Sequence, residues 1–114
     1  MPDCIFCKIA AKEMPAEIVY EDEQIVAFKD LKPAAPVHLL MIPKKHFTNL
    51  LDLAEEDVEL AGLLQMAAAR IAREMGVAEQ GFRVVCNCGR DGGQTVKHLH
   101  YHLLAGRALK WPPG

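Results

Sequence analysis

The stretch His98-Leu99-His100-Tyr101-His102-Leu103-Leu104 alternates imidazoles with apolar side chains before it ends in two leucines. Successive side chains of an extended strand point to opposite faces of the sheet, so the three histidines share one face and the apolar residues share the other. One histidine on a strand is usually a satisfied polar residue, but three on one face are hard to attribute to packing. The stretch therefore predicts a half-buried strand that carries a functional row of imidazoles.

The remainder of the chain supplies partners for this strand. Short β-branched or apolar segments predict four more strands, at residues 17–20, 24–29, 37–42 and 82–87. The first two flank an acidic turn and predict a hairpin. The third is almost continuously apolar, which favours a central strand.

Residues 53–75 predict one long helix, with Asp52 as its N-cap, Glu55 completing a capping box and Gly76 following its last turn. Its apolar stripe recurs at steps of three and four residues: Leu60, Leu64, Ala67, Ile71 and Met75. Residues 4–12 predict a short N-terminal helix. These elements indicate an α+β fold in a single domain over residues 1–114, an antiparallel sheet with a long helix packed on it.

Composition excludes several classes of protein. The 114 residues are 51% hydrophobic and 25% charged, which is the balance of a globular chain. The net charge of -2 provides no basic surface for nucleic acid, and no apolar run approaches the roughly 18 residues of a membrane span. The stretch Met1-Pro2-Asp3-Cys4 lacks the order of a secretory signal. We expect a cytoplasmic protein whose four cysteines are reduced.

A glycine-rich polar loop at residues 89–95 precedes the histidines, and its amides are suited to binding an anion. Beside such donors, one neutral imidazole can attack phosphorus, while a protonated neighbour neutralises the oxygens and gives a proton to the leaving group. The alternative is a catalytic zinc ion held by imidazoles. Three same-face positions lie nearly in a line, which fits tetrahedral ligation poorly, so we expect at most one of them to bind a metal.

The histidine stretch resembles the histidine triad (HIT) superfamily, in particular its Hint-like branch of nucleotide-binding phosphoramidases. Three other blocks share the resemblance: residues 37–46, the loop Asp91-Gly92-Gly93-Gln94-Thr95-Val96, and the ending Trp111-Pro112-Pro113-Gly114. The resemblance implies a homodimer in which two five-stranded halves form one ten-stranded sheet. It implies substrates that join a purine nucleoside 5′-phosphate, such as AMP or GMP, to an amine or another leaving group.

The resemblance also assigns roles by position. His100 matches the nucleophile, His102 a contact to the phosphate oxygens, and His38 a histidine that supports the triad. The implied catalytic set is His98, His100, His102, His38 and Thr95. The implied nucleotide-binding set is Ile5, Phe6, Ile9, Phe28, Asp30, Leu40, Asn87, Gly93, Gln94, Thr95, His100, His102 and Trp111.

Simpler explanations stay open for several of these residues. Asp30, which matches the acceptor of the ribose hydroxyls, could be a turn residue before Pro33. The apolar residues of the N-terminal helix could be only its core face. Trp111, which the resemblance places near the partner's site, could be an exposed tail residue.

Cys4 and Cys7 form a C-x-x-C pair, and a structural zinc site needs two further ligands. Relatives with this pair complete it with histidines at the positions of His46 and His98. The implied cofactor is therefore one structural zinc ion on Cys4, Cys7, His46 and His98, with no organic cofactor. Free thiols are the alternative.

Two hypotheses of different classes follow. The first is an enzyme that hydrolyses nucleoside phosphoramidates, or, as a variant, dinucleoside polyphosphates. The second is a non-catalytic dimer that senses nucleotides or docks on a partner protein. Neither requires nucleic acid or a membrane.

Overall fold

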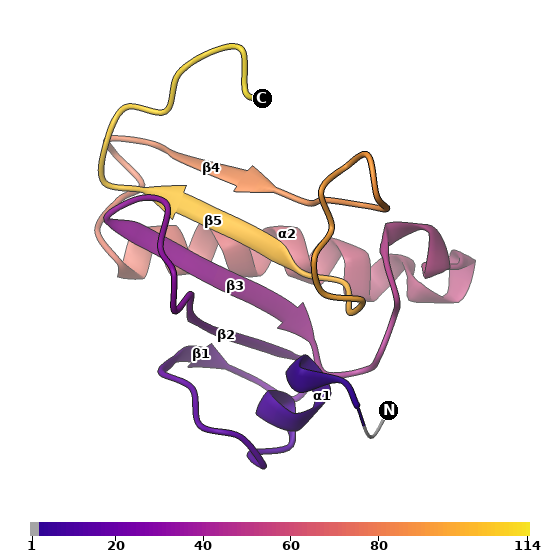
Figure 1. The fold of residues 1–114 in the computed structure, drawn as a ribbon. Helices are drawn as coiled ribbons and strands as arrows, with labels where there is room; N and C mark the ends of the chain where they lie inside the picture. The colour runs from indigo at the N-terminus through magenta and orange to yellow at the C-terminus, as the bar shows by residue number, and fades with distance from the viewer. Residues whose placement is uncertain (1–2) are drawn as a thin grey trace.

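The computed structural model describes residues 3–114, which form a five-stranded antiparallel sheet with one long helix behind it (Figure 1). The order across the sheet is β1-β2-β3-β5-β4. The strands are β1 Ile18–Glu21, β2 Ile25–Lys29, β3 Val37–Pro43, β4 Phe82–Val85 and β5 Tyr101–Ala105. The predicted α+β fold and hairpin are confirmed. Met1 and Pro2, part of the stretch considered for a targeting signal, lie outside the described residues.

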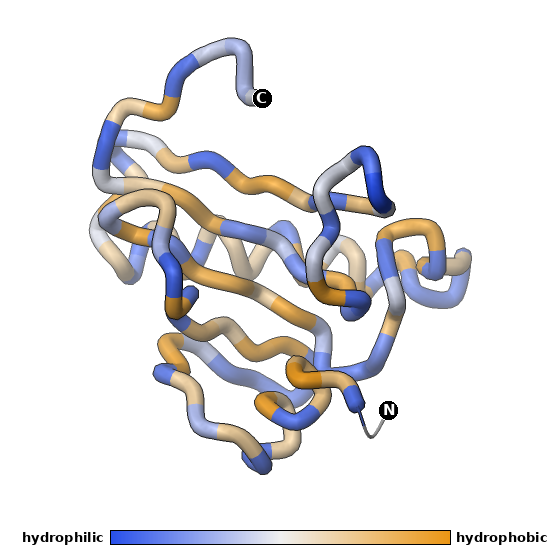
Figure 2. Tube along the Cα trace, viewed as in Figure 1, coloured by the Kyte–Doolittle hydropathy of each residue, from blue (hydrophilic) through white to orange (hydrophobic). Residues whose placement is uncertain are grey.

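Strand β3 is the centre of the sheet, as its apolar sequence predicts. Every residue after Val37 is buried, and Figure 2 shows hydrophobic colouring along most of the strand. Leu39 and Met41 pack in the core on one face, while Leu40 and Ile42 pack in the core on the other. A strand covered on both faces needs apolar residues at consecutive positions, because neither face meets water.

Two helices cover the two faces. Helix α2, Val58–Glu74, lies behind the sheet, and the short helix α1, Ile5–Ala10, lies in front of it (Figure 1). The larger core lies between α2 and the sheet and includes Leu64 and Ile71. The smaller core lies under α1 and is the side that carries the site described below. Within residues 3–114, neither helix is both long and apolar enough to cross a membrane.

The start of the long helix differs from the prediction. Residues 50–52 and 55–57 form separate 3-10 turns, and α2 begins only at Val58. The predicted capping box is wrong, because the Asp52 carboxylate accepts the N–H of Thr48 at 2.7 Å and so closes a local turn. Gly76 does follow the helix, with a φ of +74°. Met75 is 36% exposed rather than buried, because it is the C-cap and lies beyond the last turn.

The histidine strand is shorter than predicted. Pairing between β3 and β5 begins at Met41 opposite Tyr101, so His98 and His100 precede the strand. The residues before β5 make other backbone hydrogen bonds instead of sheet pairing. One of these is the Leu99 N–H, which donates to the Phe47 carbonyl at 2.7 Å. The alternation of faces persists. Leu99 and Tyr101 pack in the α2 core, whereas the rings of His98 and His100 lie against Phe6 of α1.

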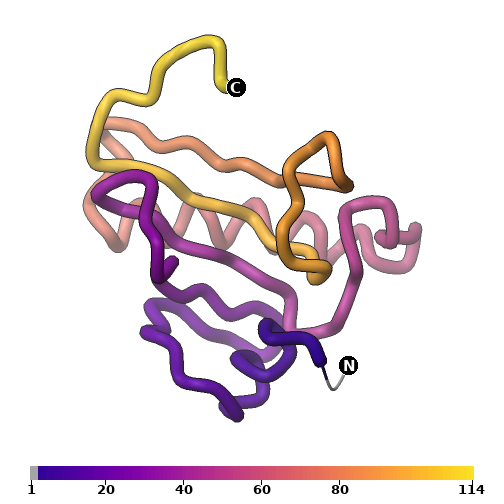
Figure 3. The backbone as a smooth tube through the Cα atoms, in the orientation of Figure 1, coloured from indigo at the N-terminus to yellow at the C-terminus, as the bar shows by residue number. Residues whose placement is uncertain are grey.

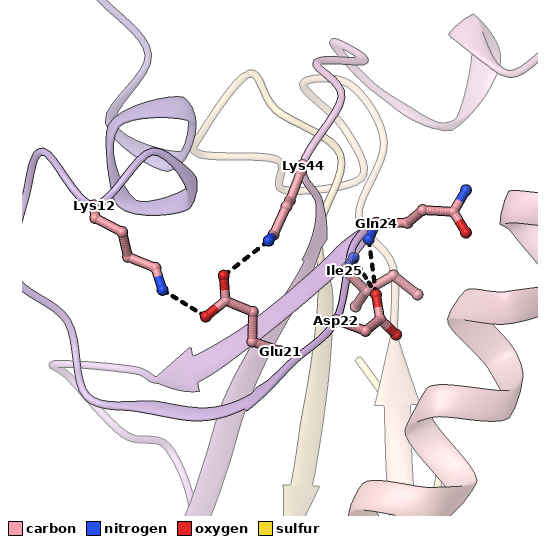
Figure 4. Close-up of polar contacts among 6 residues, drawn as sticks. All are labelled: Lys12, Glu21, Asp22, Gln24, Ile25 and Lys44. Atoms are coloured by element: carbon pink, nitrogen blue, oxygen red, sulfur yellow. Dashed lines mark hydrogen bonds and ion pairs between the residues drawn. The ribbon is translucent and has the colours of Figure 1, made fainter.

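An ion-paired cluster ties the segment after α1 to the sheet (Figure 4). Glu21 at the end of β1 pairs with Lys12 and, at 2.8 Å, with Lys44 after β3. Beside it, Asp22 Oδ1 accepts the N–H groups of Gln24 and Ile25 at 2.8 Å each and so closes the hairpin turn. Exposed ion pairs contribute little stability singly. Here the two ion pairs of Glu21 hold the segment that follows α1 close to the end of β1 and to the segment after β3.

Candidate functional site

A cavity of about 260 Å³ opens between α1, the hairpin and the loop before β5. Nine of the predicted site residues line it: Ile5, Phe6, Ile9, Phe28, Asp30, Leu40, Thr95, His100 and His102. Five lining residues were not predicted as site residues: Pro15, Ala16, Lys29, Leu31 and Val96. Most of these lie in loops without periodicity. Proximity in sequence to Asp30 or Thr95 could have indicated Lys29, Leu31 and Val96, but no sequence signal points to Pro15 and Ala16.

The apolar wall of the cavity is also the core under α1. Phe6, Ile9, Phe28 and Leu40 are all buried and belong to the same cluster. The apolar residues of the N-terminal helix are predicted either to bind the base or to form only a core face. The structure allows both, because these side chains support the helix and also present one surface to the cavity. Ile5 differs, since it is 43% exposed at the mouth and contributes little to the core.

His100 presents a free ring nitrogen. Its Nδ1 lies 2.7 Å from the backbone carbonyl of His98. A carbonyl oxygen only accepts, so Nδ1 carries the proton and Nε2 keeps its lone pair. The ring is 3% exposed and packs edge-on against Phe6 at 5.1 Å between ring centroids. The tautomer and the orientation of this imidazole are thus both fixed, and a neutral nitrogen such as Nε2 is chemically able to act as a nucleophile.

His102 is oriented through His38. The N–H of Ala34 donates to His38 Nδ1 at 2.9 Å, so the proton of neutral His38 is on Nε2. That N–H faces His102 Nδ1, also at 2.9 Å, and makes it an acceptor. The proton of neutral His102 is therefore on Nε2. This hydrogen-bond chain gives the cavity a directed N–H donor beside His100, whose ring centroid is 5.1 Å away.

The sequence predicts a protonated imidazole beside the one that attacks phosphorus, and His102 does not fit that description. Burial and the nearby His100 and His38 lower the pKa of His102 to about 4, although Asp30 acts in the opposite direction. At neutral pH the residue is an uncharged hydrogen-bond donor. It can bind a phosphoryl oxygen, but it does not bring a formal positive charge to it.

Asp30, His38 and His102 lie close enough for their ligand atoms to surround a metal ion, since these atoms are all within 4.8 Å of one another. The tautomer of His38 opposes this. Its Nε2 is protonated as long as Nδ1 accepts from Ala34, so an N–H rather than a lone pair faces the group. We interpret these three residues as a hydrogen-bonded pair of histidines beside a carboxylate rather than as a metal centre.

The glycine-rich loop closes on itself through predicted site residues. Asn87 donates from Nδ2 to the Gly92 carbonyl at 2.7 Å. Gln94 donates from Nε2 to the Thr48 carbonyl at 2.7 Å and accepts the N–H of Gly89 at 3.0 Å. Both side chains therefore hold the shape of the loop. Neither they nor Gly93 line the cavity, so their contact with a phosphate stays a prediction.

Trp111 does not reach the cavity of its own chain. It is 82% exposed in the tail after β5, which leaves the sheet beside the edge strand β4 (Figure 3). Arg83 of β4 holds this tail by donating to the carbonyls of Leu109 and Lys110 at 3.0 and 2.8 Å. The role that the sequence resemblance gives Trp111 requires a second chain.

Cys4, Cys7, His46 and His98 gather beside α1, as predicted for a metal site. Cys4 caps the helix and Cys7 lies one turn later, so both thiols point to the same end. The Nδ1 atoms of His46 and His98 are 3.1 Å apart, and Cys4 Sγ lies 3.3 Å from His98 Nδ1. Tetrahedral zinc, with bonds of about 2.0–2.1 Å to nitrogen and 2.3 Å to sulfur, requires similar ligand separations.

The protonation of His98 fits the same conclusion. Its Nε2 lies 2.9 Å from the carbonyl of Pro43 and must donate to it, so Nδ1 directs a lone pair at the two thiols. A carbonyl partner of this kind is the usual support of a metal-bound histidine. The four residues are therefore compatible with a closed structural zinc site, and His98 does not line the cavity.

Comparison with known proteins agrees with this geometry. A family profile described as "Scavenger mRNA decapping enzyme C-term binding" matches residues 3–110. An uncharacterized HIT-like protein of Synechococcus elongatus is 53% identical over 112 residues, which are 98% of this chain and 97% of the relative.

Solved structures show the same fold. A HIT family hydrolase from Legionella pneumophila Philadelphia 1 has a TM-score of 0.96 and 48% identity, with 98% of this chain and 100% of that chain covered. A Zn-bound histidine triad family protein from Mycobacterium smegmatis has a TM-score of 0.78 and 34% identity, with 93% of this chain and 76% of that chain covered.

The low pKa of His102 predicts a pH effect on stability. Between pH 6.5 and about 4 the unfolded chain protonates this residue while the folded chain does not, so its contribution to the free energy of unfolding declines as the pH falls through that range. We expect His102→Gln to reduce the loss of stability between pH 7 and pH 5, measured by urea unfolding at both values. Both proteins keep Cys4, Cys7, His46 and His98, so any effect of pH on stability through these four residues is the same in both. Equal losses in the two proteins would contradict the assignment.

Proposed function

This chain belongs to the histidine triad family, and from that premise we propose that it hydrolyses nucleoside 5′-phosphoramidates through a covalent intermediate on His100. The observation that carries the proposal is the free Nε2 of a buried imidazole beside a neutral donor at the polar end of an apolar cavity. Such a cavity suits a flat apolar base joined to a phosphoryl group.

The substrate would fill the cavity from the base to the phosphorus. The base would lie against Phe6, Ile9 and Phe28, whose rings and branched side chains offer an apolar slot. Asp30 would accept the ribose hydroxyls, since its carboxylate also lines the cavity. The α-phosphoryl group would then lie by His100 and His102. Apolar side chains discriminate weakly between similar groups, so the proposal covers conjugates of both adenine and guanine nucleotides.

The reaction would proceed in two displacements. In the first, His100 Nε2 forms a bond to the α-phosphorus, the P–N bond to the leaving amine breaks, and the amine takes up a proton from solvent. His102 Nε2–H donates to a phosphoryl oxygen as charge builds on it. In the second, water attacks the phosphorus and releases a proton to solvent, the bond to His100 breaks, and the nucleoside monophosphate leaves with His100 restored.

Two other functions remain candidates for the same cavity. A dinucleoside polyphosphate would undergo the same attack with a nucleotide as leaving group. A nucleotide sensor would use the cavity for binding alone. The fixed tautomer of His100 favours an enzyme, because binding does not require an unprotonated ring nitrogen at the phosphorus.

Turnover of adenosine 5′-phosphoramidate by the purified protein tests the enzyme hypothesis. We expect hydrolysis by the wild type and a loss of 10⁴-fold or more, on the order expected for removal of a nucleophile, in His100→Ala. Lys97→Ala, outside the cavity lining, is the control. A folded wild type that binds AMP but hydrolyses nothing would reject the phosphoramidase assignment and favour polyphosphate substrates or a sensor.

We also propose that zinc occupies the Cys4, Cys7, His46 and His98 site. Bound there, it would cross-link the start of α1 to the segments after β3 and before β5, and would supply no chemistry at the cavity. The Zn-bound relative and the ligand geometry support this assignment.

Metal analysis tests the zinc proposal. We expect about one zinc per chain and a melting temperature that falls when a chelator is added. Cys4→Ala/Cys7→Ala should lack zinc and lose the chelator effect. The matched pair Cys86→Ala/Cys88→Ala should retain both. A wild type purified in zinc-containing medium that holds no zinc would contradict the proposal.

A homodimer with β4 at its interface is the third part of the proposal. The outer edge of β4 has no strand partner among the described residues, and Phe82 at its start is 37% exposed. An unpaired edge of this kind can pair with a second copy and continue the sheet. The same arrangement would bring the tail bearing Trp111 to the partner's cavity.

Trp111 provides the measurement, because it is the single tryptophan of the chain. We expect sedimentation equilibrium to give twice the chain mass of 12.6 kDa. Dilution should dissociate the dimer and shift the tryptophan emission to longer wavelength as the ring meets water. A monomer with unchanged, solvent-exposed emission at all concentrations would contradict the dimer.

A further inference from the structure

We propose that the ribose hydroxyls of the substrate promote the chemical step itself, through a relay from Asp30 by way of His38 to His102. The proposal rests on the proposed function in one respect, because it takes Asp30 as the acceptor of those hydroxyls. It goes further by making the sugar a determinant of rate rather than of affinity alone. His38 is then a positioning residue, since it touches neither substrate nor the cavity.

The relay depends on a single proton shared between two acceptors. His38 has its Nδ1 engaged by the Ala34 N–H, which leaves one N–H, on Nε2. That N–H lies 2.9 Å from His102 Nδ1 and 3.4 Å from Asp30 Oδ2. Because His38 is neutral in this tautomer, the 3.4 Å contact with Asp30 is not an ion pair, but the carboxylate attracts the same N–H and so competes with the hydrogen bond to His102.

Asp30 is both a competitor for this proton and part of the cavity wall. Its Oδ1 accepts the N–H of Lys32 at 2.7 Å, so Oδ2 is the oxygen that faces His38. The side chain is 20% exposed and lines the cavity. A charged acceptor in a partly desolvated place attracts an N–H more strongly than a neutral ring nitrogen does. With the cavity empty, Asp30 therefore weakens the bond between His38 and His102.

A bound ribose would remove this competition. Hydroxyls that donate to Asp30 satisfy its lone pairs and reduce its attraction for the His38 N–H. The proton then points at His102 Nδ1, which keeps the proton of His102 on Nε2, facing the cavity. A substrate without the hydroxyls would leave His102 free to exchange tautomers, and the donor to the phosphoryl oxygen would be present for only part of the time.

Single-turnover kinetics with enzyme in excess test the coupling, because product release does not affect them. The probes are adenosine 5′-phosphoramidate and its 2′,3′-dideoxy analogue, each at saturating enzyme. For the wild type we expect the dideoxy analogue to react about five- to tenfold more slowly, as expected for one weakened hydrogen bond, in addition to binding more weakly. Equal rates at saturation would overturn the proposal.

Variants of His38 separate the relay from direct contacts. His38→Leu should react slowly with both probes and at nearly equal rates, while the difference in their affinities persists through Asp30. His38→Gln, whose amide N–H can replace Nε2–H, should recover part of the rate ratio. Lys32→Ala, which removes an exposed side chain outside the cavity lining and keeps the backbone N–H that Asp30 accepts, should keep the wild-type ratio. A wild-type ratio in His38→Leu would overturn the proposal.

Imidazole ¹⁵N shifts of wild-type His102 give a readout that needs neither turnover nor a stable variant. With saturating AMP we expect Nε2 in the protonated range and Nδ1 in the unprotonated range, and with 2′,3′-dideoxy-AMP both shifts should move toward their average. Identical shifts in the two complexes would overturn the relay. A protein that hydrolyses no phosphoramidate but shows the expected shifts would refute the proposed function and support the relay, so the two failures are distinguishable.

Discussion

The hydrogen bond from a buried imidazole to a backbone or side-chain acceptor is the interaction on which this site depends. His98 donates to the Pro43 carbonyl and His100 donates to the His98 carbonyl. Each bond uses one ring nitrogen and leaves the other with a lone pair in a defined direction. The two lone pairs face different places, one toward the thiols beside α1 and one toward the cavity. The different roles proposed for His98 as a metal ligand and for His100 as a nucleophile thus rest on which nitrogen the backbone engages.

The sheet makes these bonds possible because its two faces have different coverings. Helix α2 covers one face, and Leu99, Tyr101 and Leu103 pack in the hydrophobic core between that helix and the sheet. The other face is covered only by the short helix α1, which leaves room for a cavity beside the imidazoles. Buried imidazoles are tolerated there since each finds a partner, and in residues 3–114 no buried side-chain nitrogen or oxygen lacks one.

Helix α1 has six residues and is too short to be stable by itself. Its position is set by Phe6 and Ile9 in the core beneath it, by the Cys4 and Cys7 cluster at its start, and by the ion pair of Lys12 after its end. The cavity wall that α1 carries therefore depends on contacts with residues that lie from 9 to 94 positions away in sequence. Metal binding at one end of the helix would stabilise the wall at the other.

The sequence by itself predicted the apolar central strand and the row of histidines on one face, and its resemblance to a known family implied that the C-x-x-C thiols lie with His46 and His98. Period-2 alternation and a helical turn are local geometry, and the resemblance to a known family supplied the distant partners. Only the tertiary structure decided the tautomers, the neutral state of His102, the late start of α2 and the shared proton of His38. These depend on which backbone groups approach from elsewhere in the fold: the Ala34 N–H, the Pro43 carbonyl and the Thr48 N–H. The spacing of residues in the sequence cannot predict these backbone contacts, because they form only when the strands and loops are packed.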